Sequence, residues 1–201
     1  MREGDDVNSK LYDYDLPEHI IMINDFAHVI SSAWTAEYLY SNGYNMHRAI
    51  LINGLGVQTF NDSIRDMKIK TPIAKFNVET SKRYRFRLID IGVYSCTMKF
   101  SIDGHNLTVI ALDGHPIEPI EVESIVILPG ERYDFVLQTK PDSQSYFIKV
   151  TGIGHLCPYD KLYQLAELKY DKSTNVLDLD SQSYSSTKIL GKVYFWLLKH
   201  I

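Results

Sequence analysis

The sequence predicts an all-β domain, an antiparallel sandwich or barrel, and three observations support this. Short segments rich in Val, Ile, Thr, Phe and Tyr recur between turns of Gly, Pro and Asp; strands at spacings of about 8–12 residues are typical of such folds. Several segments alternate apolar and polar residues, the two-residue period of a half-buried strand. No predicted strand precedes a long amphipathic helix, which argues against a doubly wound α/β fold.

Composition limits the size and the class of the protein. The chain has 201 residues, of which 45% are hydrophobic, enough for one domain with tails. Its formal net charge of −4 gives no indication of nucleic-acid binding. No apolar stretch approaches the ~20 residues of a membrane span. We therefore expect neither nucleic acid nor membrane as a partner.

The N-terminal part of the chain contains few strands. Residues 1–18 are polar with scattered tyrosines, and we interpret them as a linker or extended arm. A buried strand is predicted at residues 19–24, and a loop with one helical turn at residues 30–44. The next strand, in residues 49–54, ends at the turn Asn53-Gly54.

The strand predicted at residues 82–89 alternates most clearly. Its apolar face carries Tyr84, Phe86 and Leu88, and its basic face carries Arg83, Arg85 and Arg87. Successive side chains of a strand point to opposite faces. We interpret the basic face as solvated and next to acidic neighbours such as Glu121 and Glu123, and not as a phosphate-binding strip.

Further strands are predicted at residues 96–102, 107–112, 120–128, 133–138 and 146–150, the last of the series. The domain then covers residues 19–170. Residues 171–201 form a polar linker and an atypical tail, whose apolar end at residues 193–198 follows no strand alternation.

The motifs of common enzymes are missing. No Gly-x-Ser-x-Gly nucleophile motif and no phosphate-binding Gly-rich loop occur. The acidic residues Glu118, Glu121 and Glu123 occupy positions that a β-protein normally exposes. We therefore predict no catalytic residue in this chain.

The histidines and cysteines do not form a metal motif. His105 and His115 each follow Asp-Gly, but an extended strand between them would separate them by roughly 30 Å. We interpret them as polar turn residues. Neither Cys96 nor Cys157 has a histidine shortly downstream, and no His-x-His occurs. A blue-copper site needs two histidines and a cysteine together, so the sequence predicts no transition-metal site.

Two kinds of covalent modification remain open at this point. Cys96 and Cys157 could pair with each other, pair outside the chain, or stay reduced, and their spacing does not decide between these. The sequons Asn61-Asp62-Ser63 and Asn106-Leu107-Thr108 are candidate N-glycosylation sites. They fit a secreted protein, although the polar, acidic start of the chain does not resemble a signal peptide.

From about residue 11 to residue 170 the sequence resembles the second domain of laccases, especially the insect type. The most similar stretches are residues 11–19 (LYDYDLPEH), 50–56 (ILINGLG), 83–89 (RYRFRLI) and 101–137 (SIDGHNLTVIALDGHPIEPIEVESIVILPGERYDFVL). Several motifs in the family's order are far more specific than one short pattern.

This resemblance implies a Greek-key β-sandwich or barrel of cupredoxin-like type, the middle one of three such domains in a secreted multicopper oxidase. In that family the copper ions are held by the flanking domains, which are then the partners of this domain. The parent would oxidise phenols, aromatic amines or metal ions and reduce O₂ to water. The middle domain itself would hold no copper and serve a structural role.

By position in the family, the loop Asp90, Ile91, Gly92, Val93, Tyr94 and Ser95 is the candidate for part of the substrate-cavity wall. The cysteine that matches Cys96 often forms a disulfide to the first domain in fungal members, so the resemblance makes Cys96 a candidate interdomain cysteine. An acidic residue that contacts substrate in fungal laccases corresponds to Thr97 here, and that role is not carried over.

Three hypotheses follow for the chain as a whole. The first is a fragment of a larger oxidase that is inactive alone. The second is a stand-alone, non-catalytic β-sandwich that binds a protein or small ligand, in which charge should have replaced the apolar docking surface. The third, an active copper enzyme by itself, would require ligands that the sequence does not show. The substrate of the parent and the oligomeric state are not predicted.

Overall fold

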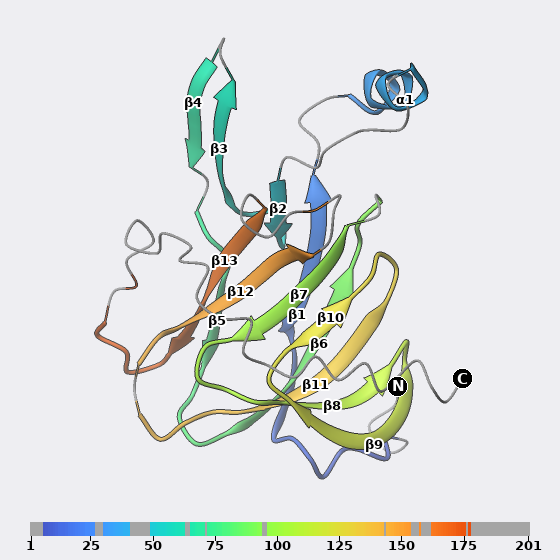
Figure 1. The fold of residues 1–201 in the computed structure, drawn as a ribbon. Coiled ribbons are helices and arrows are strands. Elements are labelled where there is room, and N and C mark those ends of the chain that lie inside the picture. The colour runs from blue at the N-terminus through green and yellow to red at the C-terminus, as the bar shows by residue number, and fades with distance from the viewer. Residues whose placement is uncertain are drawn as a thin grey trace.

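The structure is a computed structural model, and it describes residues 6–26, 30–40, 49–62, 65–70, 72–93, 96–142, 144–153, 157, 162–175 and 177. Two β-sheets pack face to face (Figure 1). The six-stranded sheet has the order β2-β1-β6-β11-β8-β9 and consists of β1 (Tyr14–Phe26), β2 (Ala49–Ile52), β6 (Arg83–Asp90), β8 (Leu107–Leu112), β9 (His115–Val122) and β11 (Arg132–Gln138). The five-stranded sheet has the order β10-β7-β12-β13-β5 and consists of β5 (Lys75–Val78), β7 (Thr97–Ile102), β10 (Ile125–Ile127), β12 (Tyr146–Ile153) and β13 (Tyr163–Tyr170).

Two smaller elements project beyond one end of the sandwich, at the top of Figure 1. They are the helix α1 (Ser31–Tyr40) and the hairpin of β3 (Val57–Asp62) and β4 (Arg65–Lys70). The two sheets confirm the predicted sandwich. The prediction of a purely antiparallel arrangement is wrong in two places, because β1 pairs with β6 and β13 with β5 in parallel.

Aromatic side chains join the two sheets in the core. Phe135 of β11 stacks on Phe86 of β6 with ring centroids 5.4 Å apart, and it meets Phe100 of the opposite sheet at 5.6 Å. All three side chains are fully buried. Tyr84, Phe86 and Leu88 all lie in this core, as the alternation of this strand predicts.

Several elements differ from the prediction. The helical turn expected near residue 30 is a helix of 10 residues. Residues 120–128 belong to two strands, because the chain leaves the six-stranded sheet after Val122 and enters the other sheet at Ile125. Strands β3, β4, β5 and β13 were not predicted. Strand β13 contains Leu, Ala, Glu and Lys, which favour helices, and it forms because nearly all of its residues are buried in the sheet.

The N-terminal region is more ordered than the linker or arm predicted for residues 1–18. Strand β1 begins at Tyr14, and its first residues pair with the start of β6. The register shifts between Asp15 and Ile20, around Pro17, which cannot donate a ladder hydrogen bond. Residues 6–13 precede this strand and bind to the outer surface of the same sheet.

The basic face of β6 is only partly solvated: Arg83 and Arg87 are half-buried, and the prediction of a solvated face is wrong at Arg85. Arg85 is only 3% exposed, and its partners are aspartates, not Glu121 or Glu123. Glu121 instead accepts a hydrogen bond from the side-chain amide of Asn106 at 2.7 Å. The alternation predicted the face correctly, but it could not show that another part of the chain covers it. The exposed positions expected for Glu118, Glu121 and Glu123 are confirmed.

His105 closes a turn, as predicted, because its backbone N–H donates to the carbonyl oxygen of Ile102 at 3.1 Å. It is buried, and its Nδ1 lies 2.8 Å from the carbonyl oxygen of Asp103 and its Nε2 2.8 Å from the Tyr170 hydroxyl. Because a carbonyl oxygen only accepts, Nδ1 carries the proton, and Nε2 accepts from Tyr170. Burial lowers the pKa of His105. His115 is exposed.

Candidate functional site

The candidate site is the loop after β6, of which residues 90–93 are described and Tyr94 and Ser95 lie outside the described residues. The side chains of two aspartates accept hydrogen bonds from the backbone of this loop. Asp90 Oδ1 accepts the backbone N–H of Gly92 at 2.8 Å, and Asp25 Oδ1 accepts that of Val93 at 3.1 Å. The loop is therefore fixed to the ends of two neighbouring strands.

The two aspartates meet because β1 and β6 are parallel. Ile23 pairs with Asp90 in the ladder, so Asp25 lies just beyond Asp90 on the core-facing side of the sheet. Both side chains are at least 97% buried, and Asp90 Oδ2 has no hydrogen-bond partner within the described part of the chain. A buried carboxylate without full hydrogen bonding is costly.

This environment changes the acidity of Asp90. Burial, followed by repulsion from the nearby charges of Asp25 and Glu131, raises the pKa of Asp90 to about 6, against the opposing effect of the Gly92 N–H. The carboxyl therefore changes its charge in the mildly acidic range. One carboxylate oxygen of each aspartate lies close to Gly92. A Cβ at this position would come within 2.8 Å of Asp90 Oδ1 and 3.0 Å of Asp25 Oδ1. Only glycine fits this position without movement of the aspartates.

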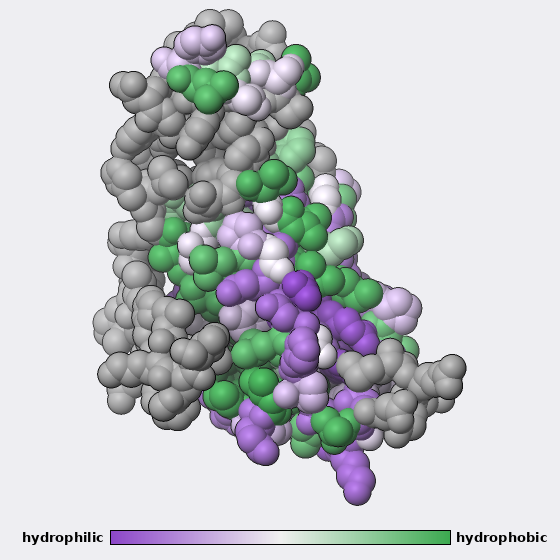
Figure 2. All heavy atoms as spheres, turned by 90° about the vertical axis from the view of Figure 1, so that its right-hand side faces the viewer, coloured by the Kyte–Doolittle hydropathy of each residue, from purple (hydrophilic) through white to green (hydrophobic). Residues whose placement is uncertain are grey.

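Apolar side chains that neighbour these two aspartates in the chain are exposed at the surface. Val93 is 82% exposed and Ile91 49%, and Phe26 at the end of β1 is also exposed. Figure 2, which shows the right-hand side of Figure 1, has hydrophobic residues between the helix at the top and a hydrophilic band across the middle. The loop thus presents an apolar surface that is held in place by buried charge.

A disulfide anchors the other side of the loop. Cys96 bonds to Cys157 with their Cα atoms 5.5 Å apart, and both are fully buried. It ties the start of β7 to the segment after β12. Of the pairings that the sequence left open, the structure contains the one within the chain. The expected bridge from Cys96 to a preceding domain is therefore not what the structure shows.

The described histidines and cysteines do not fit a copper site. Both nitrogens of His105 and the Nε2 of His19 bind protein atoms, and the two cysteines are joined to each other. Among the residues that the structure describes, no group of three or more His, Cys, Asp or Glu could hold a metal ion. The described part of the chain therefore offers copper no set of ligands.

The other sequence candidates lie apart from the loop. Asn106 is exposed at the start of β8, and Asn61 lies in β3 of the projecting hairpin. No helix among the described residues is long and apolar enough to cross a membrane. The only acidic residue of the site that the sequence indicated is Asp90; Asp25 was missed, because its neighbour is 65 positions away in the chain.

Comparison with known proteins assigns the chain to a family. The family model described as multicopper oxidase matches residues 18–173. The chain belongs to the multicopper oxidases. Its cupredoxin-like β-sandwich and its laccase-type sequence agree with this assignment.

The relatives of this multicopper oxidase chain include fungal laccases. Laccase-4 of Trametes villosa is 35% identical over 187 residues, which cover 92% of this chain and 32% of that protein. Laccase-5 of the same fungus is 37% identical over 190 residues, 94% of this chain and 33% of that protein. The crystal structure of the laccase from Botrytis aclada superposes with a TM-score of 0.63 at 25% identity, covering 84% of this chain and 31% of that one. The chain thus spans about a third of the length of the relatives it matches.

Proposed function

We propose that this chain is the central, copper-free cupredoxin-like domain of a longer, secreted, laccase-like multicopper oxidase of the insect type. The observation that carries the proposal is the coverage: nearly the whole chain matches about a third of each laccase named above. The size of the match suits one of three domains of similar length.

The chemistry of the described residues supports a domain without copper. The buried histidines are bonded within the protein, and a disulfide cysteine is not a thiolate ligand. In such an oxidase the copper ions of the flanking domains would carry the oxidation of phenols, aromatic amines or metal ions and the reduction of O₂ to water. The role of this chain is then to hold those domains at a fixed distance and angle.

The loop after β6 is proposed as part of the substrate-cavity wall. Its exposed Ile91 and Val93 offer an apolar surface to an aromatic substrate. Asp90 and Asp25 accept hydrogen bonds from the loop backbone. These bonds fix the conformation in which the loop presents its apolar side chains. Tyr94 and Ser95 belong to the same proposed wall by sequence.

Two measurements test the domain assignment. Sequencing the full transcript should show His-x-His codons upstream and a His-Cys-His downstream. The purified chain should stay colourless and retain no stoichiometric copper after dialysis against Cu²⁺ and then against buffer, whereas the full-length protein should bind copper and turn blue. An intense blue absorption in the chain alone would overturn the proposal.

The wall assignment is tested in the full-length protein. Val93→Asp should lower kcat/KM for a phenol about tenfold, mainly through KM, because an apolar contact is replaced by charge. Ile120→Asp, at an exposed apolar position of β9, is the matched control and should leave kcat/KM unchanged. Equal effects of both substitutions would contradict a role of this loop in substrate binding.

A further inference from the structure

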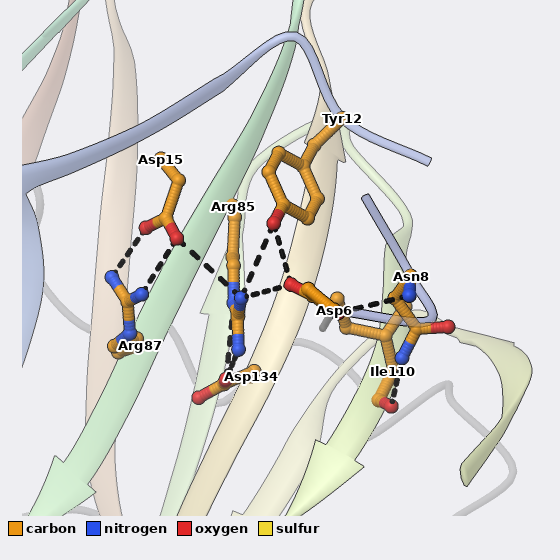
Figure 3. Close-up of polar contacts among 8 residues, drawn as sticks. All are labelled: Asp6, Asn8, Tyr12, Asp15, Arg85, Arg87, Ile110 and Asp134. Carbon is orange, nitrogen blue, oxygen red and sulfur yellow. Dashed lines mark hydrogen bonds and ion pairs between the residues drawn. The ribbon is translucent and has the colours of Figure 1, made fainter. Parts of the chain in front are cut away.

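Residues 6–13, which we name the latch segment, cover the basic face of β6. Figure 3 shows that side chains of this segment and of two strands converge on Arg85. The guanidinium is buried, with its side chain only 4% exposed. A buried guanidinium requires hydrogen-bonded partners for its donors. Some of these partners come from the sheet and others from the latch segment.

The guanidinium divides its donors between the sheet and the latch segment. Nε and Nη2 both donate to Asp134 of β11, the first at 3.1 Å. Nη1 points the other way and donates to Asp6 at 2.6 Å and to the Tyr12 hydroxyl at 3.3 Å, with Asp15 at 3.4 Å. A planar fork of this kind can bind both sides at once, which a lysine ammonium cannot do in the same geometry.

Tyr12 completes the contact. Its hydroxyl donates to Asp6 Oδ2 at 2.6 Å, and its ring lies under the guanidinium carbon of Arg85 at 5.5 Å from the centroid. Burial would raise the pKa of Asp6, but hydrogen bonds from Tyr12 and from the Asn8 backbone, together with the charge and hydrogen bond of Arg85, lower it. Asp6 is therefore a charged, fully bonded member of the cluster.

Two further contacts fasten the segment along its length. The Asn8 side-chain amide donates to the carbonyl oxygen of Ile110 in β8 at 3.0 Å, and Asn8 is 9% exposed. At the other end, Asp13 forms an ion pair with Arg83 at 2.7 Å, and Arg83 also donates to the carbonyl oxygen of Lys10 at 2.9 Å. The segment is thus held by contacts to β6 and β8, which lie on either side of β11 in the same sheet.

We infer that the latch segment is a fixed docking element that occupies the arginine face of β6, and not a flexible linker. The polypeptide chain is then attached to the outer surface of the six-stranded sheet from Asp6 onward. That this chain comes from a preceding copper domain rests on the proposed function; the docking itself does not. In that case the buried Arg85 cluster fixes the direction in which the preceding domain connects.

Trypsin reports on the docking, because Lys10 lies within the latch segment. Cleavage of the Lys10–Leu11 bond requires the segment to leave the sheet. Mass spectrometry of the digest detects the short N-terminal fragment that this cleavage releases. In the native protein this bond should be cut at least about tenfold more slowly than in Tyr12→Phe or Asp6→Asn, each of which removes a hydrogen bond at a charged group. Arg85→Lys should have a larger effect.

Two controls separate release of the segment from unfolding. Arg132→Lys alters an exposed ion pair with Asp113 and should leave the cleavage rate unchanged. Hydrogen exchange of the core amides of β6 and β11 should be the same in Tyr12→Phe as in the native protein. Cleavage of Lys10–Leu11 at equal rates in the native chain, Tyr12→Phe and Asp6→Asn would overturn the inference. Full-length sequencing that found no upstream domain would refute the proposed function and leave the docking result intact.

Discussion

Replacement of the buried Asp90 by asparagine should change how stability depends on pH. The pKa of Asp90 is raised from 3.8 to about 6 in the folded chain. Between these values the folded state holds a proton that the unfolded state has lost, so the free energy of unfolding falls as pH rises from about 4 to about 6. One pKa unit corresponds to about 1.4 kcal/mol, which puts the loss on the order of 3 kcal/mol.

Asparagine keeps the oxygen that accepts the Gly92 N–H but does not titrate. The decline between pH 4 and 6 should therefore be absent from Asp90→Asn. The buried amide group costs a further amount that does not depend on pH, so the slope and not the absolute stability is the decisive quantity. Titrating groups that do not interact with Asp90, such as His105, affect both proteins alike and cancel in the difference.

The assay is urea unfolding of the oxidised chain at half-unit steps from pH 4 to pH 8, followed by tyrosine and tryptophan fluorescence. Glu118→Gln, at an exposed carboxyl of β9, is the control: it measures how the loss of one surface charge changes the free energy of unfolding. The difference between Asp90→Asn and the native chain should grow by about 3 kcal/mol across this range. A constant difference would refute the assignment of a raised pKa to the buried carboxyl.

Three further predictions concern the surroundings of the site. Reduction of the Cys96–Cys157 disulfide, which closes a loop with a sequence separation of 61, should destabilise the chain by about 4 kcal/mol, measured as the shift in urea unfolding with and without dithiothreitol. Gly92→Ala should destabilise it as well, because the new Cβ would lie 2.8 Å from a carboxylate oxygen of Asp90, measured by the same urea unfolding. Tyr170→Phe removes the donor to His105 Nε2 and should cost about 1–3 kcal/mol by the same unfolding assay, whereas Tyr40→Phe, at a residue that is 90% exposed, is the control.

The sequence predicted the sheets well where one face of a strand is buried and the other exposed. Residues 82–89 and 107–112 carry that alternation or a continuous apolar run, and both are strands close to the predicted bounds. It failed for strands whose local preference and tertiary environment disagree. Strand β5 has only four residues and β13 is rich in helix-favouring ones. Strand β13 forms because it is buried in the sheet between β12 and β5, and β5 forms the edge of that sheet by pairing with β13.

The candidate site was predictable only in part for the same physical reason. The resemblance to laccases placed the loop at residues 90–95, but no periodicity connects Asp25 with Asp90. Their proximity depends on the parallel pairing of β1 with β6, which a local pattern does not encode. Likewise, the alternating arginines of β6 predict a basic face, but only the structure shows that residues 6–13 pack over it.

Strand β1 connects the two charged features of this domain. Its start, at Asp15, contributes to the Arg85 cluster that holds the latch segment, and its end, at Asp25, holds the loop after β6. Both contacts are made with β6, whose Arg85 and Asp90 lie at opposite ends of the same parallel pair. A chain segment attached at one end and an apolar loop presented at the other are thus tied to one two-stranded unit. For a domain proposed to fix its neighbours in space, this unit keeps the point of attachment and the proposed cavity wall at a constant separation.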